Sequence, residues 1–241
     1  MSTTPTELLE RARRQLWYHT LELPGFTTTG LFDLRDAVHH YQLPASLAGK
    51  RVLVVGTWDG FWAFELERRG AAEVVAIDLD DEQELDWPPR HRPPDPDLVR
   101  GAGFALAKEL LDSRVERVVR SIYDATPEEL GTFDLVFCGS VVMHLRDQLL
   151  ALERIAGLTK PGGMLVSAEE YEWVSDLVPF PVARFRGNRS TVGVFWLPSR
   201  KAWREMIRFA GFDRVEERAR FTLKSTQGYS VRHVVHHAFT A

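Results

Sequence analysis

The sequence is poor in cysteine and contains no long hydrophobic run. Cys138 is the only cysteine among 241 residues, which excludes an internal disulfide bond and a zinc site built from several cysteines. No stretch approaches the roughly 18 consecutive apolar residues of a membrane-spanning helix, and the first residues lack the apolar core of a signal peptide. The histidines and carboxylates show no metal-ligand spacing. We therefore expect a cytoplasmic protein with neither a metal ion nor a membrane partner.

The composition is that of a globular domain, with 44% hydrophobic and 27% charged residues. This is enough apolar material for one core. The net charge of −4 is unevenly divided, because residues 181–241 carry 12 Lys and Arg against 4 Asp and Glu, and residues 1–180 carry 18 against 30. The acidic balance disfavours a nucleic-acid partner, whereas the basic C-terminal part would suit an anionic substrate.

Short apolar runs alternate with helical patterns along the chain, which predicts crossover units around a parallel sheet. A proline-rich loop is expected over 87–97, and residues 171–198 form an irregular aromatic segment that we expect to cap a site. The last two apolar stretches alternate in the manner of an antiparallel strand pair. The predicted strands lie at 51–56, 72–80, 115–119, 133–140, 164–170, 213–221 and 231–240, and the predicted helices at 59–71, 99–113, 146–163 and 199–212.

The stretch RVLVVGTWDGFW, residues 51–62, is typical of a nucleotide-binding turn. Gly56 ends the first strand and Gly60 opens a helix, so that the backbone can approach a ligand with no Cβ in the way. Asp78 follows 22 residues after Gly56 at the tip of the second strand, where a carboxylate can accept both hydroxyl hydrogens of an adenosine ribose. The alternative is that Asp78 only caps a turn.

The middle of the turn indicates which cofactor binds. A dinucleotide requires a third glycine because its pyrophosphate lies against the turn, but Trp58 and Asp59 occupy the middle here. An acidic side chain suits a ligand with a cationic end, such as the sulfonium and ammonium groups of S-adenosylmethionine (SAM). A nucleotide-dependent oxidoreductase is the alternative, which the missing glycine and the short chain oppose.

Four segments carry a resemblance to a known family. They are LWYHTLELPGFTTTGLFDLR, LPASLAGKRVLVVGTWDGFWAFELERRGAAEVVAIDLDD, DLVFCGSVVMHLRDQLLALERIAGLTKPGGMLVS and FWLPSRKAWREMIRFAGF. Over residues 16–240 the chain resembles class I SAM-dependent methyltransferases of the bacterial tRNA wobble-uridine type, which include a carboxymethyltransferase. The resemblance implies a Rossmann-like α/β fold: a seven-stranded, mostly parallel sheet with an antiparallel C-terminal strand pair, an N-terminal helical extension and a cap insertion.

Two positions depart from the pattern of this family. Val54 stands where such enzymes usually carry an acid, and Asp59 could supply a substitute carboxylate. Met143 stands where a tyrosine holds the extra carboxylate of carboxy-SAM in the carboxymethyltransferase, although Arg232 matches an arginine of the same site. A lysine of that site has no counterpart. We therefore expect ordinary SAM as the methyl donor and S-adenosylhomocysteine (SAH) as the product.

The resemblance and the turn geometry together assign the cofactor contacts. The methionine portion would lie against the glycine turn, the ribose against the acid of the second strand, and the adenine beside the loop after the third strand. The predicted cofactor-binding residues are Gly56, Thr57, Asp59, Gly60, Asp78, Leu79, Tyr123, Asp124, Gly139 and Ser140. Cys138 is expected to be a buried small residue rather than a nucleophile, because no base is obviously paired with it.

An acceptor atom that carries a proton requires a base. A planar acceptor can be held by stacking on aromatic side chains. The candidate bases are His19, His144 and Glu169, with loop hydrogen bonding as the alternative role of His144. Trp17, Trp173 and Trp196 are candidates for an aromatic wall, with core packing as the alternative for each. Arg184, Arg186 and Arg189 of the cap, or Arg232, would suit a phosphate or carboxylate group of the acceptor.

We interpret residues 1–46 as an N-terminal extension or lid that packs on the core, and residues 47–241 as the SAM-binding methyltransferase domain with its cap insertion at 171–198. The favoured function is methyl transfer to a small, planar or anionic acceptor. A tRNA wobble-uridine methyltransferase or carboxymethyltransferase is the first alternative. The second is a non-catalytic SAM-binding protein, for which Val54 is the only positive evidence.

Overall fold

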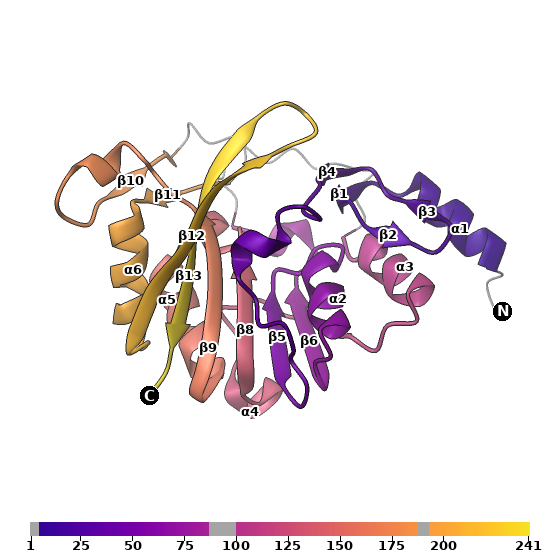
Figure 1. Cartoon of the computed structure of the whole chain (residues 1–241), viewed down its shortest axis with the longest axis horizontal. Helices are drawn as coiled ribbons and strands as arrows, with labels where there is room; N and C mark the ends of the chain where they lie inside the picture. Colours follow the sequence, from indigo (N-terminus) through magenta and orange to yellow (C-terminus); the bar gives the residue numbers. More distant parts are fainter. Residues whose placement is uncertain (1–4, 87–99, 188–192) are drawn as a thin grey trace.

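The computed structural model describes residues 5–86, 100–187 and 193–241, which form one central sheet with helices packed on it (Figure 1). The sheet has seven strands in the order β12-β13-β9-β8-β5-β6-β7. β13 is antiparallel to both of its neighbours, and the other neighbouring strands are parallel. This confirms the predicted fold class. The strands are β5 (Arg51–Val55), β6 (Glu73–Asp78), β7 (Glu116–Val119), β8 (Phe133–Gly139), β9 (Thr159–Glu170), β12 (Arg214–Lys224) and β13 (Ser230–Phe239).

The apolar runs form strands because both faces of the sheet are covered. Val52 and Val54 of β5 point to the core beside α2 (Phe61–Arg68), whereas Leu53 and Val55 point to the core beside α5 (Gln148–Leu158). A strand buried on both faces is a continuous hydrophobic run in sequence. The first face is also covered by α3 (Ala102–Leu110) and the second by α6 (Arg200–Phe209), and a short helix, α4 (Pro127–Leu130), precedes β8.

The predicted boundaries differ from the observed ones by a few residues, most of all between one helix and the strand that follows it. The helix predicted for 146–163 ends at Leu158, and β9 begins at Thr159 rather than after the Lys-Pro-Gly-Gly turn. The turn residues remain in the strand because the end of the chain pairs with them: Gly162 N donates to Ala241 O at 3.0 Å, and Thr240 N donates to Gly163 O at 3.3 Å. These partners are far apart in sequence, so the local pattern could not reveal the pairing. The proline-rich loop predicted for 87–97 lies outside the described residues.

The N-terminal part contains short strands besides the predicted helix. After α1 (Pro5–Arg14), β1 (Trp17–His19) pairs in parallel with β4 (Gly30–Phe32), and β2 (Glu22–Leu23) forms a hairpin with β3 (Phe26–Thr27). A 3-10 helix, η1 (Val38–Tyr41), then leads to β5. Strands of two or three residues are too short to produce a readable periodicity. Residues 17–32 are called the N-terminal segment below.

The N-terminal segment meets the tip of the β12–β13 hairpin above the end of the sheet where the parallel strands finish (Figure 1). Thr226 at this tip donates from its backbone nitrogen to Leu31 O at 2.9 Å and from its hydroxyl to Gly30 O at 3.1 Å. Phe32 and Ser225 form an isolated antiparallel bridge. Ligands of parallel α/β sheets collect at this end, so the segment and the hairpin tip form a roof over the expected site.

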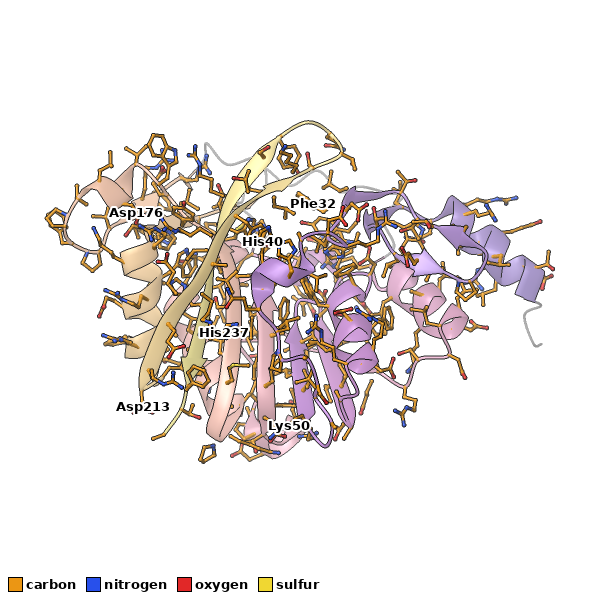
Figure 2. All side chains as sticks on the ribbon, viewed as in Figure 1. Phe32, His40, Lys50, Asp176, Asp213 and His237 are labelled. Atoms are coloured by element: carbon orange, nitrogen blue, oxygen red, sulfur yellow. The ribbon has the colours of Figure 1, made fainter. Side chains whose placement is uncertain are left out.

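The cap lies at the same end of the sheet. Figure 2 shows Asp176 of the cap at the upper edge with Phe32 of the N-terminal segment, whereas Lys50 and Asp213 lie at the opposite edge. The described part of the cap contains a 3-10 helix, η4 (Ser175–Leu177), and an antiparallel pair of strands, β10 (Ala183–Phe185) and β11 (Trp196–Pro198). The described part of the cap therefore contains regular elements where the sequence predicted an irregular segment.

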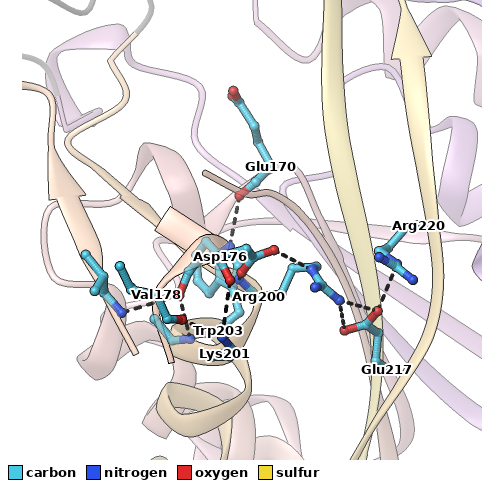
Figure 3. A network of polar contacts seen from close by, with 11 residues as sticks. Glu170, Asp176, Val178, Arg200, Lys201, Trp203, Glu217 and Arg220 are labelled. Atoms are coloured by element: carbon cyan, nitrogen blue, oxygen red, sulfur yellow. Dashed lines mark hydrogen bonds and ion pairs between the residues drawn. The ribbon is translucent and has the colours of Figure 1, made fainter. Parts of the chain in front are cut away.

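A polar network fixes the cap to α6 and β12 (Figure 3). Arg200 Nε donates to Asp176 Oδ2 at 2.5 Å, and Arg200 NH1 donates to the Glu217 carboxylate at 2.8 Å. The indole Nε1 of Trp203 donates to Glu170 O at 2.9 Å. Because both arginine contacts are charge-assisted, the network holds the cap firmly against the body of the protein.

Candidate active site

The turn after β5 approaches neighbouring parts of the protein closely. Gly56 has φ 69° and Gly60 has φ 93°, in the left-handed region that glycine tolerates. A Cβ on Gly56 would lie 2.4 Å from Val141 Cγ2, and a Cβ on Gly60 would lie 2.4 Å from the Phe64 ring. The glycines are thus required by packing within the protein, whereas the sequence analysis assigned them to the approach of a ligand. Their contact with the cofactor stays a prediction.

Asp78 lies at the end of β6 beside this turn, where its spacing placed it. Its Oδ2 accepts from Trp58 N at 2.6 Å, and its Oδ1 accepts from Leu79 N at 2.8 Å. Arg100 donates to the same Oδ1 at 3.0 Å. Asp78 therefore does cap the turn, and its contact with a ribose stays a prediction. Arg100 was missed, because no sequence pattern links it to Asp78.

A small cavity lies between these groups. It is partly open to solvent, and its volume of about 20 Å³ has room for a water molecule. In the same turn, Thr57 Oγ1 is buried with no hydrogen-bond partner among the residues that the structure describes. A buried hydroxyl that lacks a partner and a carboxylate at the strand tip fit the hydroxyl and amino groups of SAM. The cavity is lined by Gln15, Leu16, Trp58, Asp59, Asp78, Leu79, Arg100, Gly101, Gly103 and Arg117.

Asp59 holds the N-terminal segment onto the glycine turn. Its Oδ2 accepts from the backbone nitrogens of Tyr18 and His19 at 2.9 and 2.7 Å, and its Oδ1 lies 2.5 Å from His19 Nδ1. Asp59 is 2% exposed and His19 is 7% exposed. The carboxylate is satisfied by these donors, which leaves it little capacity to replace the acid missing at Val54, a residue buried within β5. Its predicted contact with the cofactor stays a prediction.

Glu169 is bound by the turn that follows β8. Its carboxylate accepts from the backbone nitrogens of Val141, Val142 and Met143 at 3.1 to 3.3 Å. Burial raises the pKa of Glu169 to about 7, although these hydrogen bonds act to lower it. Burial also raises the pKa of the neighbouring Cys138 thiol, which agrees with a packed residue rather than a nucleophile.

Ser140 follows Gly139 at the end of β8 and has φ 57°, an uncommon conformation for serine. Its backbone nitrogen donates to Ala168 O at 2.8 Å, and its hydroxyl lies 2.8 Å from His233 Nε2. Burial lowers the pKa of His233 to about 4, so the ring is neutral and can accept the hydroxyl hydrogen. His233 was not predicted as a site residue. The pattern around it is the alternation of a strand, which does not indicate a hydrogen-bond partner for the ring.

The other predicted residues near the strand ends are Tyr123, Asp124 and His144, which differ in how far they are buried. Tyr123 donates from its hydroxyl to Asp86 at 2.6 Å and accepts from Asp147 N at 3.0 Å, and Asp124 is exposed. Burial raises the pKa of the Tyr123 phenol. His144 is half-buried in a 3-10 helix, η3 (Val142–His144), which follows β8. Tyr123 thus ties the loop after β6 to the loop after β8, beside the expected adenine position.

The three candidate tryptophans occupy two kinds of environment. Trp17 is buried, and its Nε1 donates to Ala12 O at 2.9 Å, so it packs in the core beneath the N-terminal segment. Trp173 and Trp196 are 49% and 38% exposed in the cap. The guanidinium of Arg232 lies over the Trp173 ring, 4.7 Å from its centroid. The cap tryptophans and Arg232 are therefore the ones available to an acceptor.

The cap arginines have acidic partners. Arg184 forms an ion pair with Glu172, which is buried, and Arg186 lies 3.9 Å from Glu170. Arg189 lies outside the described residues. Because the two described arginines face carboxylates, the net charge of the cap is closer to neutral than its arginines alone suggested.

Neither a membrane helix nor a metal cluster occurs in the described parts of the chain. No helix there is long and apolar enough to cross a bilayer. No group of three or more His, Cys, Asp or Glu side chains in those parts could hold a metal ion.

Sequence comparisons identify a family and relatives. A family model described as Methyltransferase domain matches residues 31–217. The chain is 33% identical over 120 residues to the ubiquinone biosynthesis O-methyltransferase of Xanthomonas campestris pv. campestris, and 34% identical over 119 residues to that of Xanthomonas oryzae pv. oryzae. These matches cover 50% and 49% of this chain but 43% and 42% of the relatives, so the chain spans less than half of their length.

Solved structures show the same fold at low sequence identity. The N-terminal domain of EvdMO1 with SAH bound has a TM-score of 0.68 and 17% identity, with 99% of this chain and 98% of that one covered. The 1,6-didemethyltoxoflavin-N1-methyltransferase of Burkholderia thailandensis, solved with that acceptor and SAH, has a TM-score of 0.55 and 16% identity over 80% of this chain and 72% of that one.

Proposed function

Because the chain belongs to the methyltransferase domain family, we propose that it transfers a methyl group from SAM to a hydroxyl group of a small planar acceptor. The observation that carries this proposal is the pair formed by His19 and Asp59, which lies at the end of the sheet where ligands of this fold collect. A base held by a carboxylate next to the glycine turn is what proton removal from a hydroxyl acceptor requires.

The groups around the glycine turn support SAM as the methyl donor. Asp78 and the unpartnered Thr57 hydroxyl would hold polar groups of the nucleoside and the methionine portion, and Leu79 would lie against the adenine. SAM supplies a methyl group that its sulfonium already activates. The protein then has to orient the acceptor, exclude water and take up the acceptor's proton. The roof formed by the N-terminal segment and the hairpin tip suits the exclusion of water.

We assign proton removal to His19. Since Asp59 Oδ1 holds Nδ1, this nitrogen carries the hydrogen and Nε2 is left as the proton acceptor. The carboxylate also stabilises the imidazolium that forms. Glu169 is less suited, because it is 1% exposed and accepts three backbone hydrogen bonds. His144 is the alternative base.

The cap supports a planar acceptor with little negative charge. Trp173 and Trp196 offer partly exposed rings for stacking. Arg184 and Arg186 face carboxylates, which disfavours a phosphate group and favours a phenol. The Xanthomonas relatives are named as O-methyltransferases, which supports oxygen as the atom that is methylated.

Action on tRNA wobble uridine is a weaker proposal. The acidic net charge of −4 opposes binding to a polyanion, and the described cap arginines already have acidic partners. The basic C-terminal part is the feature that favours it, so bulk tRNA belongs among the acceptors to be tested.

SAH release from SAM tests the proposal, with a panel of phenols and catechols, a panel of sugars and bulk tRNA as acceptors. We expect a methylated phenol by mass spectrometry, and turnover that falls at least about 100-fold in His19→Ala and His19→Gln. His39→Ala, at an exposed histidine, is the control and should keep full activity. Turnover with tRNA alone would favour the tRNA variant, and SAH binding without turnover of any acceptor would favour a non-catalytic protein.

A further inference from the structure

A buried ion pair occupies the place where a nucleoside would bind. Arg100 lies two residues before α3, and its guanidinium donates to Asp78 Oδ1 at 3.0 Å. The two side chains are 7% and 9% exposed. Arg100 Nε also donates to Leu79 O at 2.9 Å. The guanidinium is thus bonded to the acid at the tip of β6 and to the residue that follows it.

Trp58 holds the other face of Arg100. The Arg100 guanidinium lies over the Trp58 ring at 4.6 Å from its centroid, and the Tyr18 ring packs beside Trp58 at 4.7 Å. Trp58 has φ 51°, which is rare for a bulky residue and directs its backbone nitrogen to Asp78. Arg100 is therefore fixed by an ion pair, a backbone hydrogen bond and a cation–π contact.

The Asp78 carboxylate cannot hold this arginine and a ribose diol together. A carboxylate has about four lone-pair positions, and three of them already accept from Trp58 N, Leu79 N and Arg100. Two ribose hydroxyls require two positions, so one present donor has to leave. The backbone nitrogens belong to the turn and the strand end, whereas Arg100 is a side chain that can rotate.

We propose that Arg100 competes with the cofactor ribose for Asp78 and thereby determines how tightly the chain binds SAM and SAH. The guanidinium must leave Asp78 before both ribose hydroxyls bind, so each binding event includes the breaking of a buried ion pair. The inference rests on the proposed function, since it takes SAM as the methyl donor. Arg100 is then a determinant of cofactor affinity that works against binding rather than a cofactor ligand.

The test is isothermal titration of SAH into the full chain and its variants. Arg100→Met keeps a long side chain against Trp58 but has no donor, and we expect it to bind SAH roughly tenfold tighter than the unmodified protein. Arg100→Lys keeps the charge but loses the second contact, to Leu79 O, and should give an intermediate affinity. Arg51→Met is the matched control, because Arg51 also combines an ion pair, to Glu73, with an aromatic ring contact but lies at the end of β5 and β6 opposite Asp78, so the SAH affinity of this variant should not change.

The inference would be overturned if the unmodified protein binds SAH and Arg100→Met binds it with equal or lower affinity. Failure of all the proteins to bind SAH would count against the proposed function instead. If Arg100→Met does not fold, as judged by its melting curve, Arg100→Lys and a crystal structure of the unmodified protein with SAH decide. In that structure the inference requires the guanidinium to be away from Asp78, and an intact ion pair beside a bound ribose would refute it.

Discussion

The Nδ1 atom of His19 lies 2.5 Å from Oδ1 of Asp59, and this contact joins two parts of the chain that are 40 residues apart. Asp59 belongs to the glycine turn and His19 to the N-terminal segment. Because the same carboxylate also accepts from the backbone of Tyr18 and His19, the N-terminal segment and the glycine turn form one unit. Changes in either part should therefore affect the other.

Asp59→Ala should destabilise the protein more than His19→Ala does. Removal of the carboxylate leaves the buried nitrogen of His19, the partly buried nitrogen of Tyr18 and the ring without an acceptor, at about 1 to 3 kcal/mol for a buried donor. Removal of the ring leaves both backbone hydrogen bonds in place. Urea unfolding measures the two free energies of unfolding. If the two variants are equally stable, Asp59 does not anchor the segment.

Asp78→Asn should weaken SAH binding by about tenfold or more, because charge-assisted hydrogen bonds to the ribose contribute roughly 1.5 to 3 kcal/mol each. Thermal shift and titration with SAH measure the loss. Asp80→Asn is the control, since Asp80 is more exposed and pairs with Arg117 rather than with the turn. Unchanged SAH affinity in Asp78→Asn would mean that the ribose binds elsewhere.

Carboxy-SAM should bind no better than SAM. Met143 is 7% exposed and has no donor for the additional carboxylate, so Arg232 would have to hold that charge without a second donor at this position. Burial of an unpaired charge is costly, so competition between the two cofactors should favour SAM. Met143→Tyr should improve carboxy-SAM binding relative to Met143→Leu. A preference of the unmodified protein for carboxy-SAM would restore the carboxymethyl interpretation.

Stability should decrease as the pH falls from 6.5 toward 4. Burial lowers the pKa of His233 and His236 from 6.5 to about 4, so in this range the unfolded chain binds more protons than the folded one. The stabilisation is complete above pH 6.5 and is lost as the pH falls through 4, by at most about 3 kcal/mol for each histidine. Melting temperatures of His236→Leu should vary less over this range, and those of the exposed His39→Gln should follow the unmodified protein.

Glu169 has the opposite effect on the pH dependence of stability. Burial raises its pKa from 4.5 to about 7, so its contribution is complete below pH 4.5 and is lost as the pH rises through 7. Glu169→Gln should therefore become relatively more stable above pH 7 than below it. An equal effect of the substitution at pH 5 and pH 8 would show that the carboxyl is ionised throughout.

Arg200→Ala should release the cap. The substitution leaves Asp176, whose side chain is 10% exposed, without its ion pair and breaks the link to Glu217. Limited proteolysis followed by mass spectrometry should show faster cleavage within residues 171–187. Arg204→Ala is the control, because Arg204 is more exposed and its ion pair is with Glu205 of the same helix rather than with the cap. Equal cleavage rates in both variants would mean that other contacts fix the cap.

The sequence was sufficient for the elements with a strong local signal. Val52 to Val55 form a strand because a run buried on both faces must be apolar throughout, and Asp78 follows at the strand tip where the spacing placed it. Gly56 and Gly60 adopt positive φ as a tight turn requires. Such features depend on a few neighbouring residues, so they can be read from the chain.

The sequence by itself thus determined the alternation of strands and helices along the chain and the position of the glycine turn with its acid. Only the tertiary structure decided the partners of the polar groups: His19 with Asp59, Arg100 with Asp78, and Ser140 with His233. The physical reason is that a hydrogen bond is satisfied by whichever group the packing brings within about 3 Å, and these partners are 22 to 93 residues apart. Periodicity specifies which face of an element is buried, but it contains no information about which distant side chain meets it there.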